Sequence, residues 1–290
     1  MAATIGIWAA PEGIASKELV AAVQRMEEHG YETLWLAETF GRDPFALAAF
    51  LGAHTSRMRL ATGIANIFHR HPGAMKQAAN TVAEQTGGRF VLGLGISSPQ
   101  IVERARKLDY SRPLAQLRNY LDEYEASRYL SIPPPQEVEI VLAALGDKMM
   151  RVARDRSAGA LTYNMTPEHT AHAREILGPD RLLAVEQKII LSTDAEQCRR
   201  TSAATLRFYQ KAPGYRRAWQ ALGFSEEEID GAAPRYLDAL VAWGDEAAIR
   251  ARIEAHIAAG ADHVCLQPLH PELGIGGIDD DALRVFAPTA

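Results

Sequence analysis

Cysteine is scarce in this chain of 290 residues, which contains only Cys198 and Cys265. The two lie far apart without metal-type spacing, so we expect no disulfide framework and a reducing, cytoplasmic location. Long apolar runs are also missing, because none approaches the roughly 18 residues that span a bilayer. The first residues, MAATIGIWAAPEG, show no basic segment followed by an apolar core, which argues against a signal peptide. The sequence therefore predicts a protein without a membrane segment.

An excess of basic charge is absent as well. The chain carries 31 basic and 36 acidic side chains, for a net charge of −5, whereas nucleic-acid-binding proteins usually carry a basic excess or stripe. It also has no Pro/Gly/Ser-rich linker, low-complexity tract or exact repeat that would divide it. Hydrophobic residues make up 47% of the chain, which is enough for a sizeable core. We expect one domain over residues 1–290 and no nucleic-acid partner.

Eight short apolar runs recur along the chain, and segments with helical spacing separate them. The expected strands cover residues 4–8, 33–37, 59–64, 89–94, 138–142, 159–163, 182–191 and 263–267. Eight strands that alternate with helices over about 250 residues are typical of a (β/α)8 TIM barrel. We predict this single α/β barrel, with a helical insertion around residues 194–242. An open doubly wound sheet is the alternative, although it usually has fewer strands.

Polar side chains and glycines follow several of these runs. In a barrel the carboxyl ends of the strands form the face where ligands bind. Glu38 ends the second run and is a candidate acid/base group, or forms an ion pair with Arg42. Small residues before Asn66 suit a flat ring packed against backbone, with the Asn66 amide bonding ring heteroatoms, although a simple bulge is the alternative. Residues 93–98, GLGISS, lack the third glycine of a dinucleotide fingerprint, and we favour the close approach of another ligand. The residues expected to line it are Gly95, Ser97 and Ser98.

The triplet His69-Arg70-His71 resembles the His-x-His pair of metal-dependent barrel hydrolases. Those enzymes also need histidines after the fifth and sixth strands and an aspartate after the eighth. This chain has Leu145-Gly146, Tyr163-Asn164 and Gln267 at those places. We therefore predict no metal site. His71 is expected to cap the next helix, and His69 to line the mouth of the barrel.

Two further segments have unusual polarity. Glu186, Gln187 and Lys188 interrupt the otherwise apolar seventh strand, so at least one of them should point into the barrel and need a partner. A buried Lys–Glu pair is the structural explanation. The helix over residues 45–53, FALAAFLGA, is apolar on every side. An outer barrel helix keeps one wet face, so the excess apolar face predicts a subunit interface, most simply in a two-fold homodimer.

Taken together, several segments resemble the bacterial luciferase-like monooxygenase superfamily, and more closely its branch that depends on coenzyme F420, a deazaflavin. The segments are LWLAETFGRDPF, RLATGIAN, GGRFVLGLGISSP, LTYNMTPEHT, AREILGP and VAWGDEAAIRARIEAHIAAGADHVCLQPL, which run across nearly the whole chain. The resemblance implies a barrel with a flavin-type ring in its mouth. It also implies a cis peptide bond between Gly63 and Ile64, in a bulge that supports the ring from behind.

The same resemblance implies further roles. Asn66 would reach the ring edge, and Glu38 occupies a strand-end position where relatives often carry an acid. Amides at a helix start would bind the cofactor phosphate. The residues near that phosphate would be Leu145, Gly146, Tyr163 and Asn164. The chain departs from the pattern in two places: Glu38-Thr39 stands where many deazaflavin enzymes have Asp-His, and Ser98 stands where some have Glu.

The expected function is hydride transfer between C5 of coenzyme F420 and a small organic substrate. Glu38 is the first candidate for acid/base work and His69 the second. An FMN-dependent monooxygenase, supplied with electrons by a partner flavin reductase, is one alternative. A flavin- or deazaflavin-binding protein without turnover is another. We expect the substrate determinants in the loops over residues 100–110 and 207–224.

Overall fold

Eight parallel strands close into a barrel in the computed structural model, which describes residues 3–270, 274 and 277–288. The barrel strands are β1 (Thr4–Ala9), β2 (Thr33–Leu36), β3 (Arg59–Thr62), β5 (Phe90–Gly95), β6 (Glu139–Ala143), β7 (Gly159–Thr162), β8 (Leu182–Leu191) and β10 (His263–Pro268). Each pairs in parallel with the next, and β10 pairs with both β8 and β1, which closes the ring. The predicted (β/α)8 barrel is therefore confirmed.

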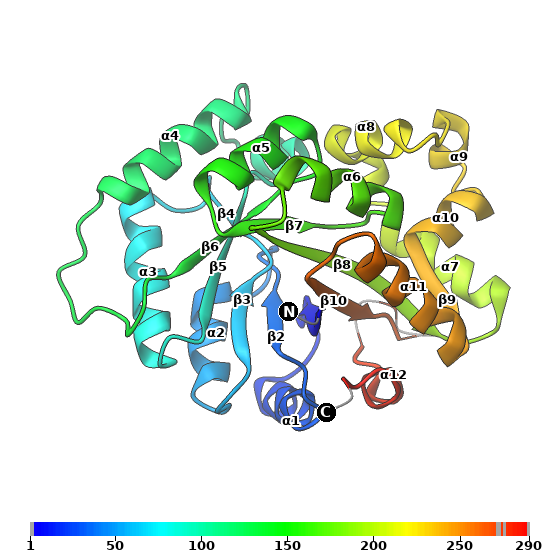
Figure 1. Ribbon diagram of the computed structural model, residues 1–290, viewed down its shortest axis with the longest axis horizontal. Coiled ribbons are helices and arrows are strands. Elements are labelled where there is room, and N and C mark those ends of the chain that lie inside the picture. Colours follow the sequence, from blue (N-terminus) through cyan, green and yellow to red (C-terminus); the bar gives the residue numbers. More distant parts are fainter. Residues whose placement is uncertain (1–2, 271–273, 275–276, 289–290) are drawn as a thin grey trace.

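Helices cover the outside of the barrel and connect its strands (Figure 1). They are α1 (Ser16–Glu28), α2 (Pro44–Gly52), α3 (Pro72–Gln85), α4 (Pro113–Ala126), α5 (Asp147–Arg156), α6 (Pro167–Leu177), α11 (Glu246–Ala258) and α12 (Asp280–Val285). Helix α2 begins as the sequence predicts: Asp43 accepts hydrogen bonds from the amides of Phe45 and Ala46, and Pro44 occupies the first turn. Among the described residues, no helix is both long and apolar enough to cross a membrane.

Two short strands depart from the expected pattern. The third expected strand is divided: β3 ends at Thr62, a cis peptide bond joins Gly63 to Ile64 as predicted, and β4 (Ala65–Asn66) then pairs with β5. The helix expected over residues 234–242 ends at Leu240 as α10 (Pro234–Leu240), and β9 (Val241–Gly244) follows it. The reason is that β8 extends beyond its pairing with β7, so its last residues offer their backbone to β9.

The region expected as a helical insertion forms several short helices with a core of their own. They are α7 (Ala195–Leu206), the 3-10 turn η2 (Tyr209–Lys211), α8 (Pro213–Ala221), α9 (Glu226–Asp230) and α10. The helical region expected over residues 194–222 is broken because Pro213 cannot continue a helix and begins α8 instead. Trp219 and Tyr236 are fully buried in this core. Helices α8, α9 and α10 lie together at the upper right of Figure 1.

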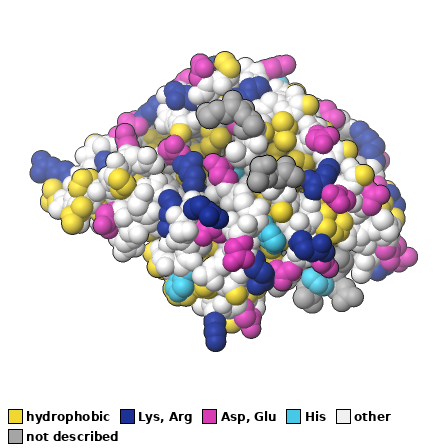
Figure 2. Space-filling model, turned by 60° about the horizontal axis from the view of Figure 1, so that its bottom comes forward, with side chains coloured by type: hydrophobic (Ala, Val, Ile, Leu, Met, Phe, Trp, Pro, Cys, Tyr) yellow, Lys and Arg dark blue, Asp and Glu magenta, His cyan; other side chains and the backbone are white. Residues whose placement is uncertain are grey.

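Side chains along each strand alternate between the barrel interior and the layer beneath the helices. The inward-facing apolar cluster is Trp8, Trp35, Ala61, Val91, Val141, Leu161, Ala184 and Cys265. Because side chains two positions apart on a strand face the same side, Tyr163 faces the barrel interior as Leu161 does, and Gln267 faces it as Cys265 does. A larger apolar cluster fills the space between the strands and the outer helices. On the surface, charged side chains of both signs are interspersed (Figure 2).

Glycines let the bulge after β3 pack directly on β5. A Cβ atom at Gly93 would lie 1.8 Å from the Thr62 carbonyl oxygen, and one at Gly95 would lie 2.7 Å from Cδ1 of Ile64. The Thr62 hydroxyl also donates a hydrogen bond to the Gly93 carbonyl at 2.7 Å. The chain's own bulge therefore explains why both positions are glycine. The expected approach of a ligand to Gly95 stays a prediction.

Gln187 faces the outer layer, whereas its two neighbours in the polar triplet face the interior. Its side-chain nitrogen donates to the Leu240 carbonyl at 3.1 Å, so its oxygen is the acceptor that faces Nε2 of His256 at 2.9 Å. The Thr170 hydroxyl lies 2.8 Å from Nδ1 of the same ring. These contacts suit a neutral imidazole, and burial lowers the pKa of His256 to about 3. The network links β8 to α11 and α6.

We expect this network to make stability depend on pH. His256 takes up a proton near pH 6.5 in the unfolded chain but stays neutral in the folded protein down to about pH 3. The unfolded state therefore binds more protons in this window, and the free energy of unfolding falls by up to about 1.4 kcal/mol per pH unit as the pH drops. Urea unfolding at pH 7 and pH 5 measures the loss. His256→Gln should reduce the difference between the two pH values, and an unchanged difference would contradict the assignment.

Gly93→Ala should destabilise the fold, because the added methyl group would overlap the Thr62 carbonyl oxygen. We expect a loss of about 3 kcal/mol in the free energy of unfolding. Gly214→Ala is the matched control: no described atom lies within 4 Å of a Cβ there, and alanine is favoured in a helix such as α8. Urea denaturation of both variants tests this, and equal stability would argue against the close approach of the bulge to β5.

Candidate functional site

The residues predicted from the sequence gather at one end of the barrel, which we call the mouth: the strand ends and loops on the carboxyl side of the barrel strands. The positions are Glu38 after β2, Gly63, Ile64 and Asn66 after β3, Gly95, Ser97 and Ser98 at and after the end of β5, Leu145 and Gly146 after β6, and Tyr163 and Asn164 after β7. Parallel strands all end on the same side, so five neighbouring strands bring these residues to one face.

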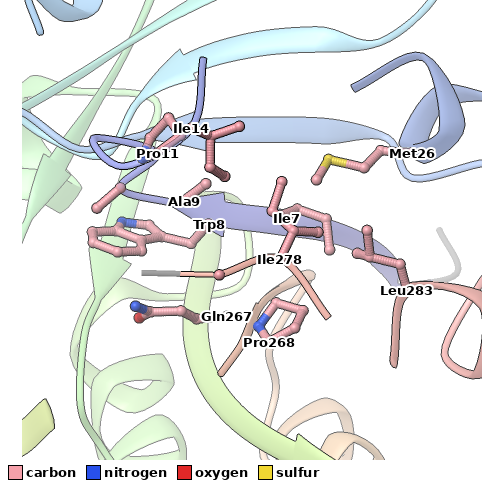
Figure 3. A pocket seen from close by; sticks show the side chains of 12 residues that line it. Ile7, Trp8, Ala9, Pro11, Ile14, Met26, Gln267, Pro268, Ile278 and Leu283 are labelled. Carbon is pink, nitrogen blue, oxygen red and sulfur yellow. The ribbon is translucent and has the colours of Figure 1, made fainter. Parts of the chain in front are cut away.

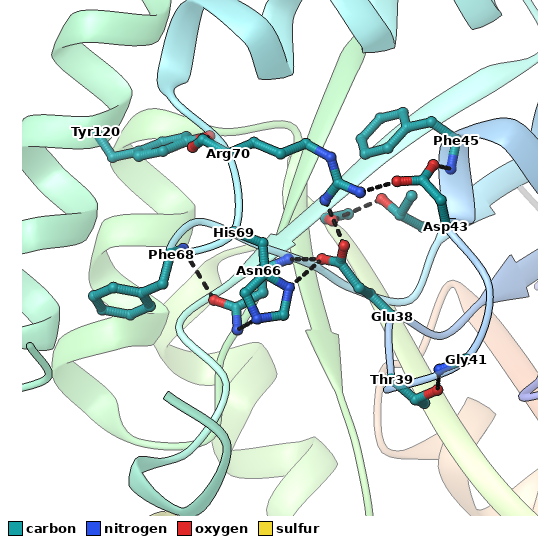
Figure 4. Close-up of polar contacts among 12 residues, drawn as sticks. Glu38, Thr39, Gly41, Asp43, Phe45, Asn66, Phe68, His69, Arg70 and Tyr120 are labelled. Carbon is teal, nitrogen blue, oxygen red and sulfur yellow. Dashed lines mark hydrogen bonds and ion pairs between the residues drawn. The ribbon is translucent and has the colours of Figure 1, made fainter. Parts of the chain in front are cut away.

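Glu38 is held by contacts from the segment that follows the bulge (Figure 4). Arg70 donates a hydrogen bond to its Oε1, and the backbone amide of Asn66 donates to Oε2 at 2.7 Å. Nδ1 of His69 lies 3.4 Å from the same Oε2. The Glu38 side chain is only 6% exposed. The alternative ion pair with Arg42 is wrong, because the loop turns Arg42 toward the carbonyl groups of the β1–α1 connection instead.

The hydrogen bonds around His69 define which of its nitrogens carries the proton. The backbone amide of Phe68 donates to Oδ1 of the Asn66 side chain at 3.1 Å. The group of Asn66 that faces Nε2 of His69 at 3.1 Å is therefore the side-chain nitrogen, Nδ2. Since Nε2 accepts, Nδ1 holds the hydrogen and points it toward Glu38. His69 therefore stands beside Glu38 at the mouth and directs its Nδ1 hydrogen toward the carboxylate. The predicted contact of Asn66 with a ring edge stays a prediction.

Arg70 extends this network outward to helix α2. Its guanidinium donates to Asp43 as well as to Glu38 and lies 4.8 Å from the ring centre of Phe45. Burial works against the charge of Asp43, but hydrogen bonds from the Ala46 amide and from Arg70 lower the pKa of Asp43 overall. Burial likewise opposes the charge of Arg70, yet the bond to Glu38 raises the pKa of Arg70. The start of α2 is thereby tied to the mouth.

A second charged group lies inside the barrel on the other side of the mouth. Nζ of Lys188 lies 3.1 Å from Oε1 of Glu186, and both side chains are fully buried. Nζ also donates to Oδ1 of Asn164 at 2.5 Å and lies 3.9 Å from the ring centre of Tyr163. Burial raises the pKa of Glu186 and lowers the pKa of Lys188 to about 8. The predicted buried Lys–Glu pair is confirmed.

Tyrosines from β7 and from the insertion cover this pair. The Tyr209 hydroxyl donates to the Tyr163 hydroxyl at 3.2 Å, and the Tyr163 hydroxyl donates to Oε1 of Gln267 at 3.0 Å. The indole of Trp8 packs against Tyr163 with ring centres 4.8 Å apart, and the indole nitrogen of Trp219 donates to the Asn164 carbonyl at 2.9 Å. Segment 207–224, expected to determine the substrate, therefore reaches the mouth.

The other loop expected to bind substrate begins with the π-helix η1 (Gln100–Ala105). The Gln100 side chain donates to the Lys211 carbonyl in the insertion, and the Tyr110 hydroxyl donates to the Ser97 carbonyl at 3.1 Å. The loop thus joins the insertion to the end of β5. Apolar rings and chains on the mouth loops stay exposed, which suits an organic substrate. They are Phe40 at 61%, Leu108 at 40% and Phe208 at 44%.

Several features of the mouth fit a ligand with a polar ring and an anionic group. Within the described part of the chain, nine buried side-chain polar atoms have no hydrogen-bond partner, and they include three at the mouth: Oγ of Ser98, Nδ2 of Asn164 and Nε2 of Gln267. Native proteins rarely leave such atoms unpaired unless water or a ligand meets them. Gly146 provides no capping side chain at the start of α5, which leaves amide donors of the first turn for an anion; the Met149 amide is not among them, because it donates to the Gly146 carbonyl at 3.0 Å.

The histidine pair does not form a metal site. Nδ1 of His71 accepts from the Gly73 amide at 3.1 Å, which caps α3 as predicted, whereas His69 faces Glu38. Among the described residues, no three His, Cys, Asp or Glu side chains are grouped so that they could hold a metal ion.

The cavity drawn in Figure 3 reaches these polar groups at Gln267. Trp8 and Gln267 border it, and its remaining lining is mainly apolar and comes from β1, the β1–α1 connection, the end of β10 and the residues before α12, with Met26 of α1 and Leu283 of α12 at one side. Ile7, Met26 and Leu283 belong to the outer core between the strands and the helices. This cavity therefore runs from the mouth, at Trp8 and Gln267, into the packing beneath the helices.

Sequence reasoning missed four residues that help to build the mouth: Trp8, Arg70, Tyr209 and Gln267. Trp8 and Gln267 could have been found by extending the strand period of two to the last residues of the first and eighth strands. Arg70 was seen only as the middle of a histidine pair. No local pattern marks Tyr209, because its role depends on how the insertion folds over β7.

Comparisons with known proteins agree with this architecture. A Mycobacterium tuberculosis protein, named as a candidate coenzyme F420-dependent oxidoreductase, is 39% identical over 118 residues, which cover 41% of this chain and 33% of that protein. The structure of coenzyme F420-dependent tetrahydromethanopterin reductase from Methanopyrus kandleri superposes with a TM-score of 0.80 at 15% identity, covering 99% of this chain and 98% of that one. The oxygenating constituent of 3,6-diketocamphane monooxygenase from Pseudomonas putida, in complex with FMN, superposes with a TM-score of 0.69 at 14% identity, covering 92% of each chain.

The family model described as luciferase-like monooxygenase matches residues 2–263. This match extends from the first barrel strand to the start of the eighth and includes the bulge, both charged groups of the mouth and the insertion. The chain therefore belongs to the luciferase-like monooxygenase family.

Proposed function

We propose that this protein is an oxidoreductase that transfers hydride between C5 of coenzyme F420 and a small organic substrate at the mouth. The observation that carries the proposal is the set of buried, unpartnered polar atoms beside a tightly packed backbone bulge, in a chain with relatives named for coenzyme F420. A deazaflavin bound there would supply the hydride chemistry at C5. The protein would supply position, polarity and exclusion of water.

The bulge from Gly63 to Asn66 would support the ring. The indole nitrogen of Trp8 donates to the Gly63 carbonyl at 2.8 Å, and the Asn66 amide is held by Glu38. A Cβ atom at Gly63 would lie 2.8 Å from the Trp8 indole nitrogen, so the backbone is packed from behind. A bulge that is held in place at both ends would keep a planar ring in one orientation, and hydride transfer requires such a fixed orientation.

The start of α5 would hold the phosphate of the cofactor. Its first amides lack a capping side chain, and no described atom lies within 4 Å of a Cβ at Gly146. A helix start presents amide donors and a partial positive charge to an anion. Oδ1 of Asp147, in the first turn, lies 2.9 Å from Nε2 of His172. This contact limits the repulsion between the Asp147 carboxylate and the phosphate.

Glu38 remains our candidate for acid/base work, with His69 second, but the contacts of Glu38 favour a positioning role. Its two oxygens already accept hydrogen bonds from Arg70, which also pairs with Asp43, and from the backbone amide of Asn66. His69 carries its proton on Nδ1, which faces Glu38. The pair would therefore act chiefly by holding the bulge and its neighbouring loop in place.

Titration with oxidised coenzyme F420 and, separately, with FMN tests the choice of cofactor. We expect micromolar binding of coenzyme F420 and much weaker binding of FMN. Tight binding of FMN without binding of coenzyme F420 would instead support an FMN-dependent monooxygenase that needs a flavin reductase. Binding of either cofactor without turnover of any substrate would support a binding protein. Binding of neither would contradict the proposal.

The Glu38→Gln variant, assayed alongside this titration, separates two roles for the carboxylate. As a positioning group, Glu38 should affect cofactor affinity and turnover together, each by about 10- to 100-fold, because loss of its charge leaves Arg70 without its buried partner. As an acid or base, it should affect kcat with little change in cofactor affinity and should alter the pH profile. Full turnover of the variant would exclude both roles.

We also propose that the protein forms a homodimer through α2. Leu47, Ala48 and Leu51 bury one face of this apolar helix, but the Phe50 ring on another face is 39% exposed. Association would bury that ring.

Phe50→Glu should shift the protein from dimer to monomer, because a charge at the interface opposes its burial. Ile257→Glu is the matched control, since Ile257 is 36% exposed on α11. Sedimentation velocity of both variants and of the parent protein measures the effect. A monomeric parent protein, or dissociation by both substitutions alike, would contradict the proposed interface.

A further inference from the structure

Two buried amide groups in the mouth present donors that nothing in the described part of the chain accepts. They are Nδ2 of Asn164 and Nε2 of Gln267, in side chains that are 1% and 3% exposed. A buried donor without an acceptor costs about 1–3 kcal/mol. Two such donors in one part of the mouth point to an acceptor that comes from outside the chain.

The orientation of each amide follows from the contact of its oxygen. Lys188 can only donate, so the atom of Asn164 that faces Nζ at 2.5 Å is the oxygen. Tyr209 donates to the Tyr163 hydroxyl, which leaves the Tyr163 proton for Oε1 of Gln267 at 3.0 Å. The nitrogen of each amide is therefore the side that lacks a partner.

The two amides belong to one group of side chains. Lys188 and Gln267 are directly paired on β8 and β10, so their side chains leave the barrel wall at one level and on one face. Tyr163 contacts both of them, through its ring and its hydroxyl respectively. Asn164 follows Tyr163 in the chain and holds Lys188 by its oxygen. The unpaired nitrogens thus lie at the same end of the barrel, around the same lysine and tyrosine.

The charge of this group indicates the kind of acceptor that it suits. Glu186 balances Lys188 at 3.1 Å, so the amides are neutral donors beside a neutral pair. Such a set matches an oxygen that accepts hydrogen bonds and carries no proton of its own. Carbonyl and carboxylate oxygens have this chemistry.

We propose that Asn164 and Gln267 form a two-donor subsite for a carbonyl or carboxylate oxygen of a small molecule bound at the mouth, with Tyr163 as the positioning residue for Gln267. The identity of that molecule rests on the proposed function. The oxygen belongs either to the dione edge of the cofactor ring or to the substrate. Both sources present the same kind of hydrogen-bond acceptor, and the experiment below separates them.

Side-chain amide signals in nitrogen-15 NMR spectra report on the two donors directly. The signals are assigned as those lost in Gln267→Met and in Asn164→Gly, where glycine tolerates the positive φ of 58° at this position. The probes are oxidised coenzyme F420, FMN, acetone and acetate, each added to the whole protein, with the last two repeated in the presence of the cofactor. We expect both amide signals to move downfield and to exchange more slowly with one of these probes.

The outcomes distinguish the sources. Movement with a cofactor alone assigns the oxygen to the ring, and movement only with acetone or acetate assigns it to the substrate. If neither cofactor binds, the proposed function fails, while acetone and acetate still decide the subsite. Two amide signals that no probe moves would overturn the inference.

Variants add a quantitative test. Gln267→Met keeps the length of the side chain but removes the donor, and it should raise the Kd of the active probe about tenfold. Gln136→Met is the control, because that exposed glutamine donates to the Gly88 carbonyl far from the mouth. Tyr163→Phe should weaken the response of the Gln267 signal and spare that of Asn164, which a purely structural role of Tyr163 would not do. An unchanged Kd in Gln267→Met would overturn the subsite.

Discussion

The ammonium group of Lys188 is buried inside the barrel, and only neighbouring strands can supply the partners that it needs. Glu186 balances its charge, Asn164 accepts its hydrogen bond, and the ring of Tyr163 covers it. Removing two charges from water costs about as much as their attraction returns, so stability alone does not explain the pair. Its structural effect is to orient the side chains of Asn164 and Tyr163. The hydrogen bond between Tyr163 and Tyr209 then links these side chains to the insertion.

The opposite half of the mouth is ordered by a second charged network. Glu38 is 6% exposed, Arg70 is 18% exposed and Asp43 is 48% exposed, so the network runs from the interior to the surface. In the Lys188 half one carboxylate balances one ammonium group, whereas in the Glu38 half a single guanidinium serves two carboxylates. The bulge seated on Gly93 stands between the two halves and takes its position from close packing.

The fold and the outline of the site could be predicted from local patterns. Glu38 and Asn66 stand at strand ends that the spacing of apolar residues reveals, and parallel strands must end together. The partner of Glu38 could not be predicted, because Arg42 is nearer in the chain, whereas Arg70 reaches it across the bulge. The pairing of β9 with β8 was missed for a similar reason, since it depends on how far β8 extends beyond its neighbour.

By itself, the sequence determined the barrel, the end of it where polar side chains gather and the chemical types found there. Strand period, helix caps and glycines are local signals, because they can be recognised without knowing which distant residues are in contact. The tertiary structure decided which polar atoms meet and which are left without a partner. Tyr163 and Gln267 lie 104 positions apart, yet they share a hydrogen bond. The pairing of β8 with both β7 and β10 sets that contact, because it brings residues that are far apart along the chain together at the mouth.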